Sequence, residues 1–198
     1  MVYKKLEVIS EFLAKSKRAA SFASDDGHYP FFTSSNTEKR CDEADYNEPC
    51  IIIGTGGTAN VKFSSSFSCS ADNFIIKSAL ANVDIKYLYH YLYSNLATLN
   101  SLFQGTTIKH LSKQSLNDLE IPIPPLELQQ QIVSILDADH AVIRANKELI
   151  AMYETRKKGI IFAGTLNKPN KSLGELCSTT QGTYITPEMK QEVGEFPV

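Results

Sequence analysis

The most regular hydrophobic pattern of the chain lies between residues 126 and 160. One row of apolar residues recurs every seven positions, and a second row is interleaved with it. The first row is Leu128, Ile135, Val142 and Leu149, and the second includes Ile132, Tyr153 and Ile160. This spacing predicts a helix with one apolar stripe. Three prolines precede the stripe, and because proline fixes its own φ and disfavours helix in the residue before it, we expect the helix to begin near Glu127.

The predicted helix is longer than a small domain needs. About 35 residues make a rod of ~50 Å, so we expect the stripe to contact a partner helix. Asp139 and Asn146 interrupt the second row, and polar residues in such a seam commonly fix register or partner choice. The alternative is one long helix packed on its own domain. The residues predicted for the dimerisation helix are Leu128, Ile132, Ile135, Val142, Asn146, Leu149 and Tyr153.

Upstream of the prolines, strand patterns and helix patterns follow one another. The apolar runs at residues 29–32, 49–53 and 72–77 predict strands, and Thr33–Asn47 is expected to be a loop. From Asp84, a suitable N-cap, apolar residues follow helical spacing as far as Leu99. The pattern predicts an α+β fold: a globular mixed domain over residues 1–120, a proline motif and long helix over 121–163, and a linker with a further segment over 164–198.

Composition narrows the class of protein. Hydrophobic residues make up 42% of 198 residues and the formal net charge is -2, values typical of a soluble globular chain. No apolar run approaches the ~18 residues of a membrane span, and the N-terminus lacks the apolar core of a secretion signal. The four cysteines lack C-x-x-C spacing. We therefore expect a cytoplasmic protein with reduced, structural cysteines.

Positive charge is concentrated in particular segments. Residues 61–113 hold five Lys and Arg against two Asp and Glu, whereas residues 114–154 hold two against seven. The segment Gln104–Lys113 combines an amide, hydroxyls and cations, which suit DNA phosphates and base edges. An ordinary helix-to-strand connection is the alternative there. The residues predicted to contact DNA are Lys17, Arg18, Lys39, Arg40, Lys62, Gln104, Thr106, Thr107, Lys109, His110 and Lys113.

Motifs for catalysis are missing from the sequence. The glycine-rich segment Gly54–Thr58 follows a strand, but it lacks G-K-[ST] and an extended segment follows it, so it is interpreted as a hairpin turn. No H-E-x-x-H or G-x-S-x-G motif occurs, nor the N-P-P-[YF] or D-P-P-[YF] motif of amino-methylating enzymes. The four histidines fall in four different contexts. We expect no catalytic site, no metal site and no cofactor of the chain's own.

A short repeat of the N-terminal sequence occurs near the end of the chain. Lys171, Leu173 and Leu176 lie 167 positions after Lys4, Leu6 and Ile9, and Gly194–Val198 repeats Gly27–Phe31 at the same offset. The segment Ile121-Pro-Ile-Pro-Pro-Leu-Glu-x-Gln129, followed by the long helix, resembles the specificity (S) subunits of type I restriction-modification enzymes. Gly105-Thr106 with Leu111-Ser112 resembles that family's target recognition domain. One departure is Leu128 before Gln129, where the family usually has Glu.

The resemblance implies a non-catalytic DNA-specificity subunit of half length, with one target recognition domain, one helix and the start of a second domain. The head would read half of a split target in double-stranded DNA. The helix would pair antiparallel in a homodimer and dock modification (methyltransferase) subunits, and through them a restriction subunit. S-adenosylmethionine, ATP and Mg would belong to those partners. The alternative is a dimeric coiled-coil adaptor whose head binds a protein or small ligand.

Overall fold

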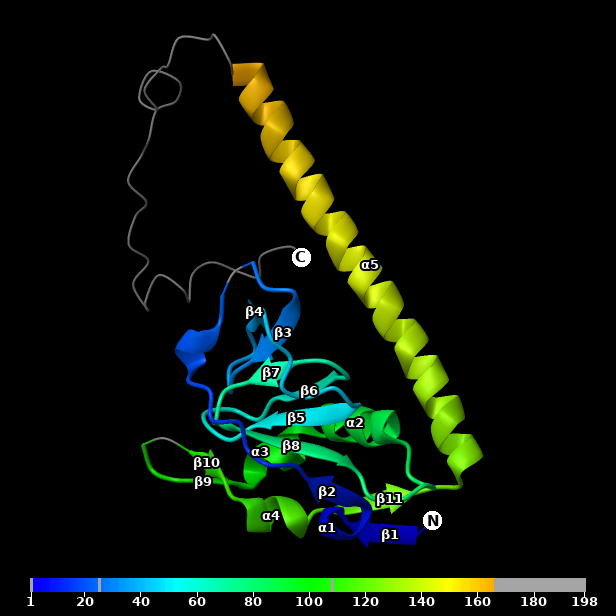
Figure 1. Cartoon of the computed structure of the whole chain (residues 1–198). Helices are drawn as coiled ribbons and strands as arrows, with labels where there is room; N and C mark the ends of the chain where they lie inside the picture. The colour runs from blue at the N-terminus through cyan, green and yellow to red at the C-terminus, as the bar shows by residue number, and fades with distance from the viewer. Residues whose placement is uncertain (1, 25, 108, 166–198) are drawn as a thin grey trace, which may run out of the picture. The chain divides into compact units, whose positions relative to one another are not determined.

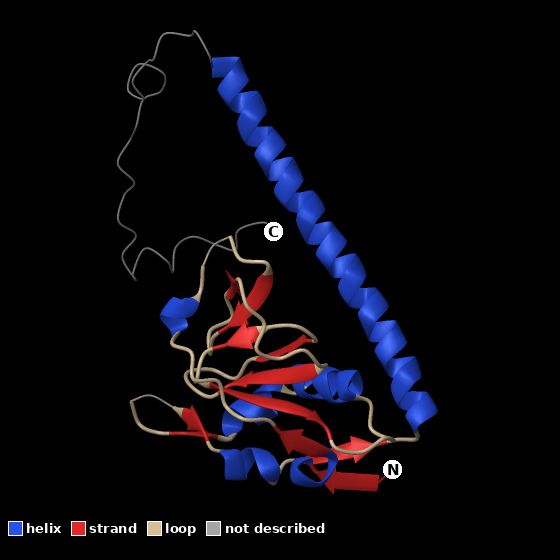
Figure 2. Ribbon diagram, viewed as in Figure 1, coloured by secondary structure: helices blue, strands red, loops and turns tan. Residues whose placement is uncertain are grey.

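The structure is a computed structural model that describes residues 2–24, 26–107 and 109–165. The chain divides into two compact units, Met1–Ala145 and Asn146–Val198. The first unit is a sheet-rich α+β domain that ends in a helix (Figures 1 and 2), so the predicted fold class is confirmed. The repeat at residues 171–198 lies outside the described residues, and the proposed domain boundaries stay predictions.

A four-stranded antiparallel sheet forms the centre of the domain. Its strands, in spatial order, are β2 (Ser10–Phe12), β8 (Asn73–Ser78), β5 (Cys50–Gly54) and β6 (Val61–Ser64). Every residue of β5 is buried, because one face packs on helices and the other on a second sheet. Ile51 and Ile53 belong to the core cluster on the side of the helices, while Cys50 and Ile52 belong to the core cluster on the side of the second sheet. The predicted strands at residues 49–53 and 72–77 and the hairpin turn between β5 and β6 are confirmed.

A three-stranded sheet covers the other face. It contains β3 (Tyr29–Phe32), paired antiparallel with β4 (Glu38–Cys41) and parallel with β7 (Ser68–Cys69). The prediction of a loop throughout Thr33–Asn47 is therefore wrong at β4. This edge strand pairs through its backbone while Glu38, Lys39 and Arg40 remain exposed. Only Cys41 is buried, so the sequence lacks the alternation that indicates a strand.

Two helices cover the face of the central sheet that is opposite the three-stranded sheet. They are α2 (Ile85–Ser94) and α3 (Leu96–Ser101). The predicted N-cap is confirmed, since the Asp84 carboxylate accepts hydrogen bonds from the backbone N–H groups of Lys86 and Tyr87. The predicted helix is interrupted at Asn95, whose side chain donates to the Tyr91 carbonyl over 2.8 Å. Tyr87 is buried, and its hydroxyl donates to the Pro122 carbonyl.

Short elements complete the domain. They are β1 (Val2–Lys5), α1 (Leu6–Ile9), the 3-10 helix η1 (Ala20–Phe22), β9 (Phe103–Gln104), β10 (His110–Leu111), α4 (Lys113–Asn117) and β11 (Glu120–Ile123). The first three residues of the proline motif, Ile121–Ile123, lie in β11, with Pro122 opposite Tyr3 of β1. This sheet has only two strands, so a proline without an N–H group is tolerated at its edge.

The long helix α5 spans Leu126–Thr165, and its 40 residues correspond to ~60 Å. It begins at the prolines as predicted, and the Pro125 carbonyl accepts hydrogen bonds from Leu128 and Gln129. Gln129 in its first turn is fully buried. The Gln129 Oε1 accepts from the backbone N–H of Asp84 at 2.8 Å, and its Nε2 donates to the carbonyls of Pro124 at 2.8 Å and Asn82 at 3.0 Å.

A second contact joins α5 to α2. Asp137 accepts from Lys86 Nζ at 2.6 Å and contacts His90 Nε2 at 3.0 Å. The Lys86 hydrogen bond, aided by His90, lowers the pKa of Asp137. The His140 ring centroid lies 5.1 Å from that of buried His90. These two histidines fall in unrelated sequence contexts, because α2 and α5 are far apart along the chain.

Most of the α5 stripe is exposed in the described chain. Ile132 packs partly against the core, whereas Leu128, Ile135 and Val142 are 43%, 63% and 59% exposed. Beyond Ala145, Asn146, Leu149 and Tyr153 are also exposed. A surface of this kind can contact a second helix, and the pairing itself stays a prediction.

Replacing Gln129 with Met is expected to destabilise the protein by about 2–4 kcal/mol, because three backbone groups lose their partner in a buried setting. The measurement is the free energy of unfolding in urea. Gln130→Met is the matched control, since Gln130 is the next residue and is exposed. Equal effects of the two substitutions would contradict the role given to Gln129.

Candidate nucleic-acid interface

A polar cleft of about 510 Å³ opens in the first unit, at one end of the central sheet. It is formed by the turns between β3 and β4, between β5 and β6 and between β7 and β8, together with β10. The lining residues are Ser34, Ser35, Thr55, Gly56, Gly57, Thr58, Asp72 and His110. Hydroxyls, a carboxylate and an imidazole thus gather where several turns meet, although they are distant in sequence.

Backbone hydrogen bonds join the glycine turn to the segment that the sequence predicts to meet DNA. Gly57 N–H donates to the Lys109 carbonyl at 3.1 Å, and Leu111 N–H donates to the Thr55 carbonyl at 2.9 Å. Gly57 has a φ of +83°, a conformation that favours glycine. The turn rejected as a phosphate loop therefore lies beside β10 of the β9–β10 hairpin (Figure 1).

One wall of the cleft is held by Asn60 and Lys62. Asn60 is buried, and its Nδ2 donates to the Ser34 carbonyl at 2.6 Å. The Lys62 Nζ donates to Asn60 Oδ1 at 2.6 Å and to the Thr33 carbonyl at 2.9 Å. Burial lowers the pKa of Lys62 to about 8. Lys62, predicted as a DNA contact, thus has its amine committed to shaping the turn beside the cleft.

The charge of Arg18 is balanced inside the domain. Its guanidinium bonds to Glu43 and Asp45, each at 2.6 Å, and lies 3.8 Å from the centroid of the Phe22 ring. These carboxylates raise the pKa of Arg18, and in turn Arg18 lowers the pKa of Asp45. Of the two adjacent candidates, Lys17 is the exposed one.

The other predicted DNA contacts are exposed and fall into two groups. Lys39 and Arg40 lie on β4, in the hairpin whose turn supplies Ser34 and Ser35 to the cleft. The second group lies on or next to the β9–β10 hairpin. Its members are Gln104, Thr106, Thr107, Lys109, His110 and Lys113. Lys113 Nζ lies over the Phe12 ring at 4.6 Å.

Of the residues that line the cleft, only His110 is among the predicted DNA contacts; the glycine turn was interpreted as a hairpin, and Ser34, Ser35 and Asp72 were given no role. Their signal was their position: Ser34 and Ser35 follow a predicted strand, and Asp72 is the first residue of the strand predicted at residues 72–77. Antiparallel pairing of β5 with β8 brings Gly54 opposite Asn73, and this places Asp72 beside the glycine turn. Without the strand order, however, the turns could not be assigned to the same end of the sheet.

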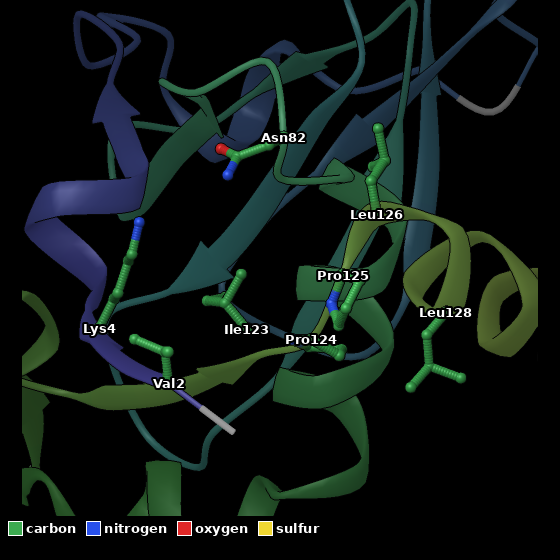
Figure 3. A pocket seen from close by; sticks show the side chains of 8 residues that line it. All are labelled: Val2, Lys4, Asn82, Ile123, Pro124, Pro125, Leu126 and Leu128. Atoms are coloured by element: carbon green, nitrogen blue, oxygen red, sulfur yellow. The ribbon is translucent and has the colours of Figure 1, made fainter.

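A second cavity of about 590 Å³ lies where β1, β11 and the first turn of α5 meet (Figure 3). Its lining is apolar except for Lys4 and Asn82. The remaining lining residues are Val2, Ile123, Pro124, Pro125, Leu126 and Leu128.

Within the described ranges, no group of three His, Cys, Asp or Glu side chains is placed to bind a metal. No described helix is long and apolar enough to cross a membrane.

Comparison with known proteins identifies the class. The sequence model of one protein family, the type I restriction modification DNA specificity domain, matches residues 2–152. The chain belongs to this family. The type I restriction enzyme EcoDI specificity subunit of Escherichia coli is 24% identical over 136 residues, which cover 68% of this chain and 30% of that protein. The MjaVIII specificity subunit of Methanocaldococcus jannaschii is 36% identical over 117 residues, covering 58% and 24%.

Solved structures share the fold. The S subunit of a type I restriction-modification system from M. genitalium has a TM-score of 0.70 at 21% identity, over 83% of this chain and 45% of that one. The HsdS subunit from Thermoanaerobacter tengcongensis has a TM-score of 0.53 at 16% identity, over 75% and 39%. The match therefore spans less than half the length of each of these relatives.

Replacing Asn60 with Ala is expected to lower the free energy of unfolding by about 1–3 kcal/mol, because the Ser34 carbonyl and the Lys62 amine lose a buried partner. Amide hydrogen exchange in residues 33–37 should become faster. The control is Asn36→Ala, at an exposed position of the same turn. Unchanged exchange in the Asn60 variant would show that this side chain does not hold the wall.

Proposed function

We propose that the chain is a DNA sequence-specificity subunit of a type I restriction-modification system, and that its head reads one half of a bipartite target. Family membership supports the class. The observation that carries the assignment is the polar cleft, where the β9–β10 hairpin meets the glycine turn. Such a cleft offers hydrogen-bonding groups of the kind that contact base edges.

The exposed cations beside the cleft would position the DNA. Lys109 follows the hairpin turn and shares backbone hydrogen bonding with the cleft, while Lys39 and Arg40 lie on the neighbouring hairpin. Phosphate contacts supply most of the affinity and set the orientation, whereas base contacts supply specificity. Arg18 and Lys62 would act indirectly, since their charged groups bond within the domain.

The chemistry is assigned to partner subunits. Burial raises the pKa of Cys50 to about 11 and of Cys69 to about 12, so neither thiol is a nucleophile at neutral pH. The Asp137 carboxylate bonds to both His90 and Lys86 and so links α5 to α2. We assign this acid and histidine pair a structural role. Modification subunits would bring S-adenosylmethionine, and a restriction subunit would bring ATP and Mg.

The helix α5 would serve as spacer and docking surface. Antiparallel pairing with a second copy, through Leu128 to Ile160, gives a two-fold dimer with a recognition head near each end. Two heads on rods of ~60 Å could contact major-groove faces one helical turn or more apart, ~34 Å. The exposure of Ile135, Val142 and Leu149 supports this proposal.

The decisive experiment is co-expression with a cognate modification subunit. The proposal requires a complex and methylation at a defined split sequence, and absence of both would end it. The alternative, an adaptor whose head binds a protein or small ligand, is favoured by the apolar cavity beside β1. A salt titration separates the two, because DNA binding by the first weakens steeply with salt, while the second predicts little DNA binding at any salt.

Lys109→Ala is expected to weaken DNA binding and to lower the slope of log affinity against log salt by about one. Binding isotherms across a salt series provide the measurement. Lys77→Ala is the control, because Lys77 already pairs with Glu48 at 3.3 Å and with Glu11 at 3.8 Å. Equal slopes for the wild type and the Lys109 variant would move the phosphate contact elsewhere.

Leu149→Asp is expected to dissociate the proposed dimer, because a charge placed in an apolar seam loses hydration without gaining a partner. Sedimentation analysis should then give the mass of a single chain. Ala151→Asp is the control: it adds the same charge at an exposed position on the side of the helix away from Leu149. A mass that Leu149→Asp leaves unchanged would contradict pairing through this stripe.

A further inference from the structure

Asp72 differs in hydrogen-bonding chemistry from the rest of the polar cleft. The hydroxyls of Ser34, Ser35, Thr55 and Thr58 both donate and accept, and a neutral imidazole does so too. A carboxylate only accepts. Among the exposed side chains that line the cleft, Asp72 is therefore the one that can only accept a hydrogen bond from a ligand.

The Asp72 carboxylate is available. It is exposed, and it forms no ion pair or hydrogen bond with any residue that the structure describes. Three other aspartates of the same domain have partners: Asp45 pairs with Arg18, Asp118 with Lys5 and Asp137 with Lys86. The Asp72 side chain thus has no evident role within the fold.

The backbone around Asp72 is nevertheless fixed. The Asp72 carbonyl accepts from Thr55 N–H at 3.0 Å and from the Thr55 hydroxyl at 3.1 Å. On one side, Ala71 N–H donates to the Arg18 carbonyl at 3.1 Å. On the other, fully buried Asn73 donates from Nδ2 to the carbonyls of Phe32 and Ser70. These bonds fix the backbone position from which the exposed Asp72 side chain projects, before any ligand binds.

An unpaired carboxylate on a DNA-binding face repels phosphates. It is favourable there only if it faces hydrogen-bond donors, and in the major groove these are the amino groups of cytosine N4 and adenine N6. We propose that Asp72 is a specificity-determining residue that accepts a hydrogen bond from such an amino group on DNA bound at the cleft. This inference rests on the proposed function and specifies how the head selects its sequence.

The test is selection from a duplex DNA library with a randomised central segment, using the full chain as wild type, Asp72→Asn and Asp72→Ala. The wild type should enrich a motif that contains a cytosine or adenine which Asp72→Ala no longer prefers. The expected loss of preference at that position is about 5-fold to 150-fold. Glu7→Gln, which removes an exposed carboxylate from α1, is the control and should leave the motif unchanged.

Asp72→Asn identifies the base, because an amide retains adenine, to which it can both donate and accept, and loses the preference for cytosine. Either result supports the inference. If both Asp72 variants enrich the wild-type motif with every position intact, the inference is overturned while the proposed function stands. If the wild type enriches no motif and its binding does not depend on salt, the proposed function fails, and the inference fails with it.

Discussion

The side chain of Gln129 is the contact on which the arrangement of the first unit depends. It sits in the first turn of α5 and bonds to backbone groups of three other residues: Asp84, at the N-terminus of α2, and Asn82 and Pro124. A buried amide can meet its hydrogen-bonding needs only if all three segments are in place. The strand β11, the loop after β8 and the start of α5 are thereby fixed to one another.

This junction and the polar cleft lie at opposite ends of the same strand. β8 begins at Asn73, next to Asp72 in the cleft, and ends at Ser78, shortly before the residues that Gln129 contacts (Figure 1). Ile75 and Ile76 between them are buried on the two faces of the sheet. A rigid strand therefore separates the surface proposed to read DNA from the start of the helix proposed to space it.

The sequence predicted those features whose signal is local. Prolines before a heptad pattern located the start of α5, Asp84 located the N-cap of α2, and the apolar run at residues 49–53 located a buried strand. It did not predict β4, whose exposed side chains carry no alternation, or α4, which has only five residues. Gln129 belongs to the motif that carries the family resemblance, but only the fold shows that it is buried while Gln130 and Gln131 are exposed.

The candidate site was predictable in part for the same reason. Composition predicted a DNA-contacting loop at Gln104–Lys113, where the structure has β9 and β10, whereas the contributions of Ser34 and Asp72 depend on strand order. Arg18 and Lys62 looked like free cations in sequence, and their partners come from elsewhere in the chain: Glu43 and Asp45 for Arg18, and Thr33 for Lys62. Composition indicates which residues can bind an anion, and packing decides which remain available.

The cleft is made largely of turn residues, and this bears on how such a protein could diversify. Ser35, Gly57, Thr58, Asp72 and His110 are exposed and belong to neither hydrophobic core cluster. Exchanges at exposed positions of this kind usually alter folding free energy little. New target preferences could thus arise turn by turn in a lineage, on a scaffold whose interior stays constant.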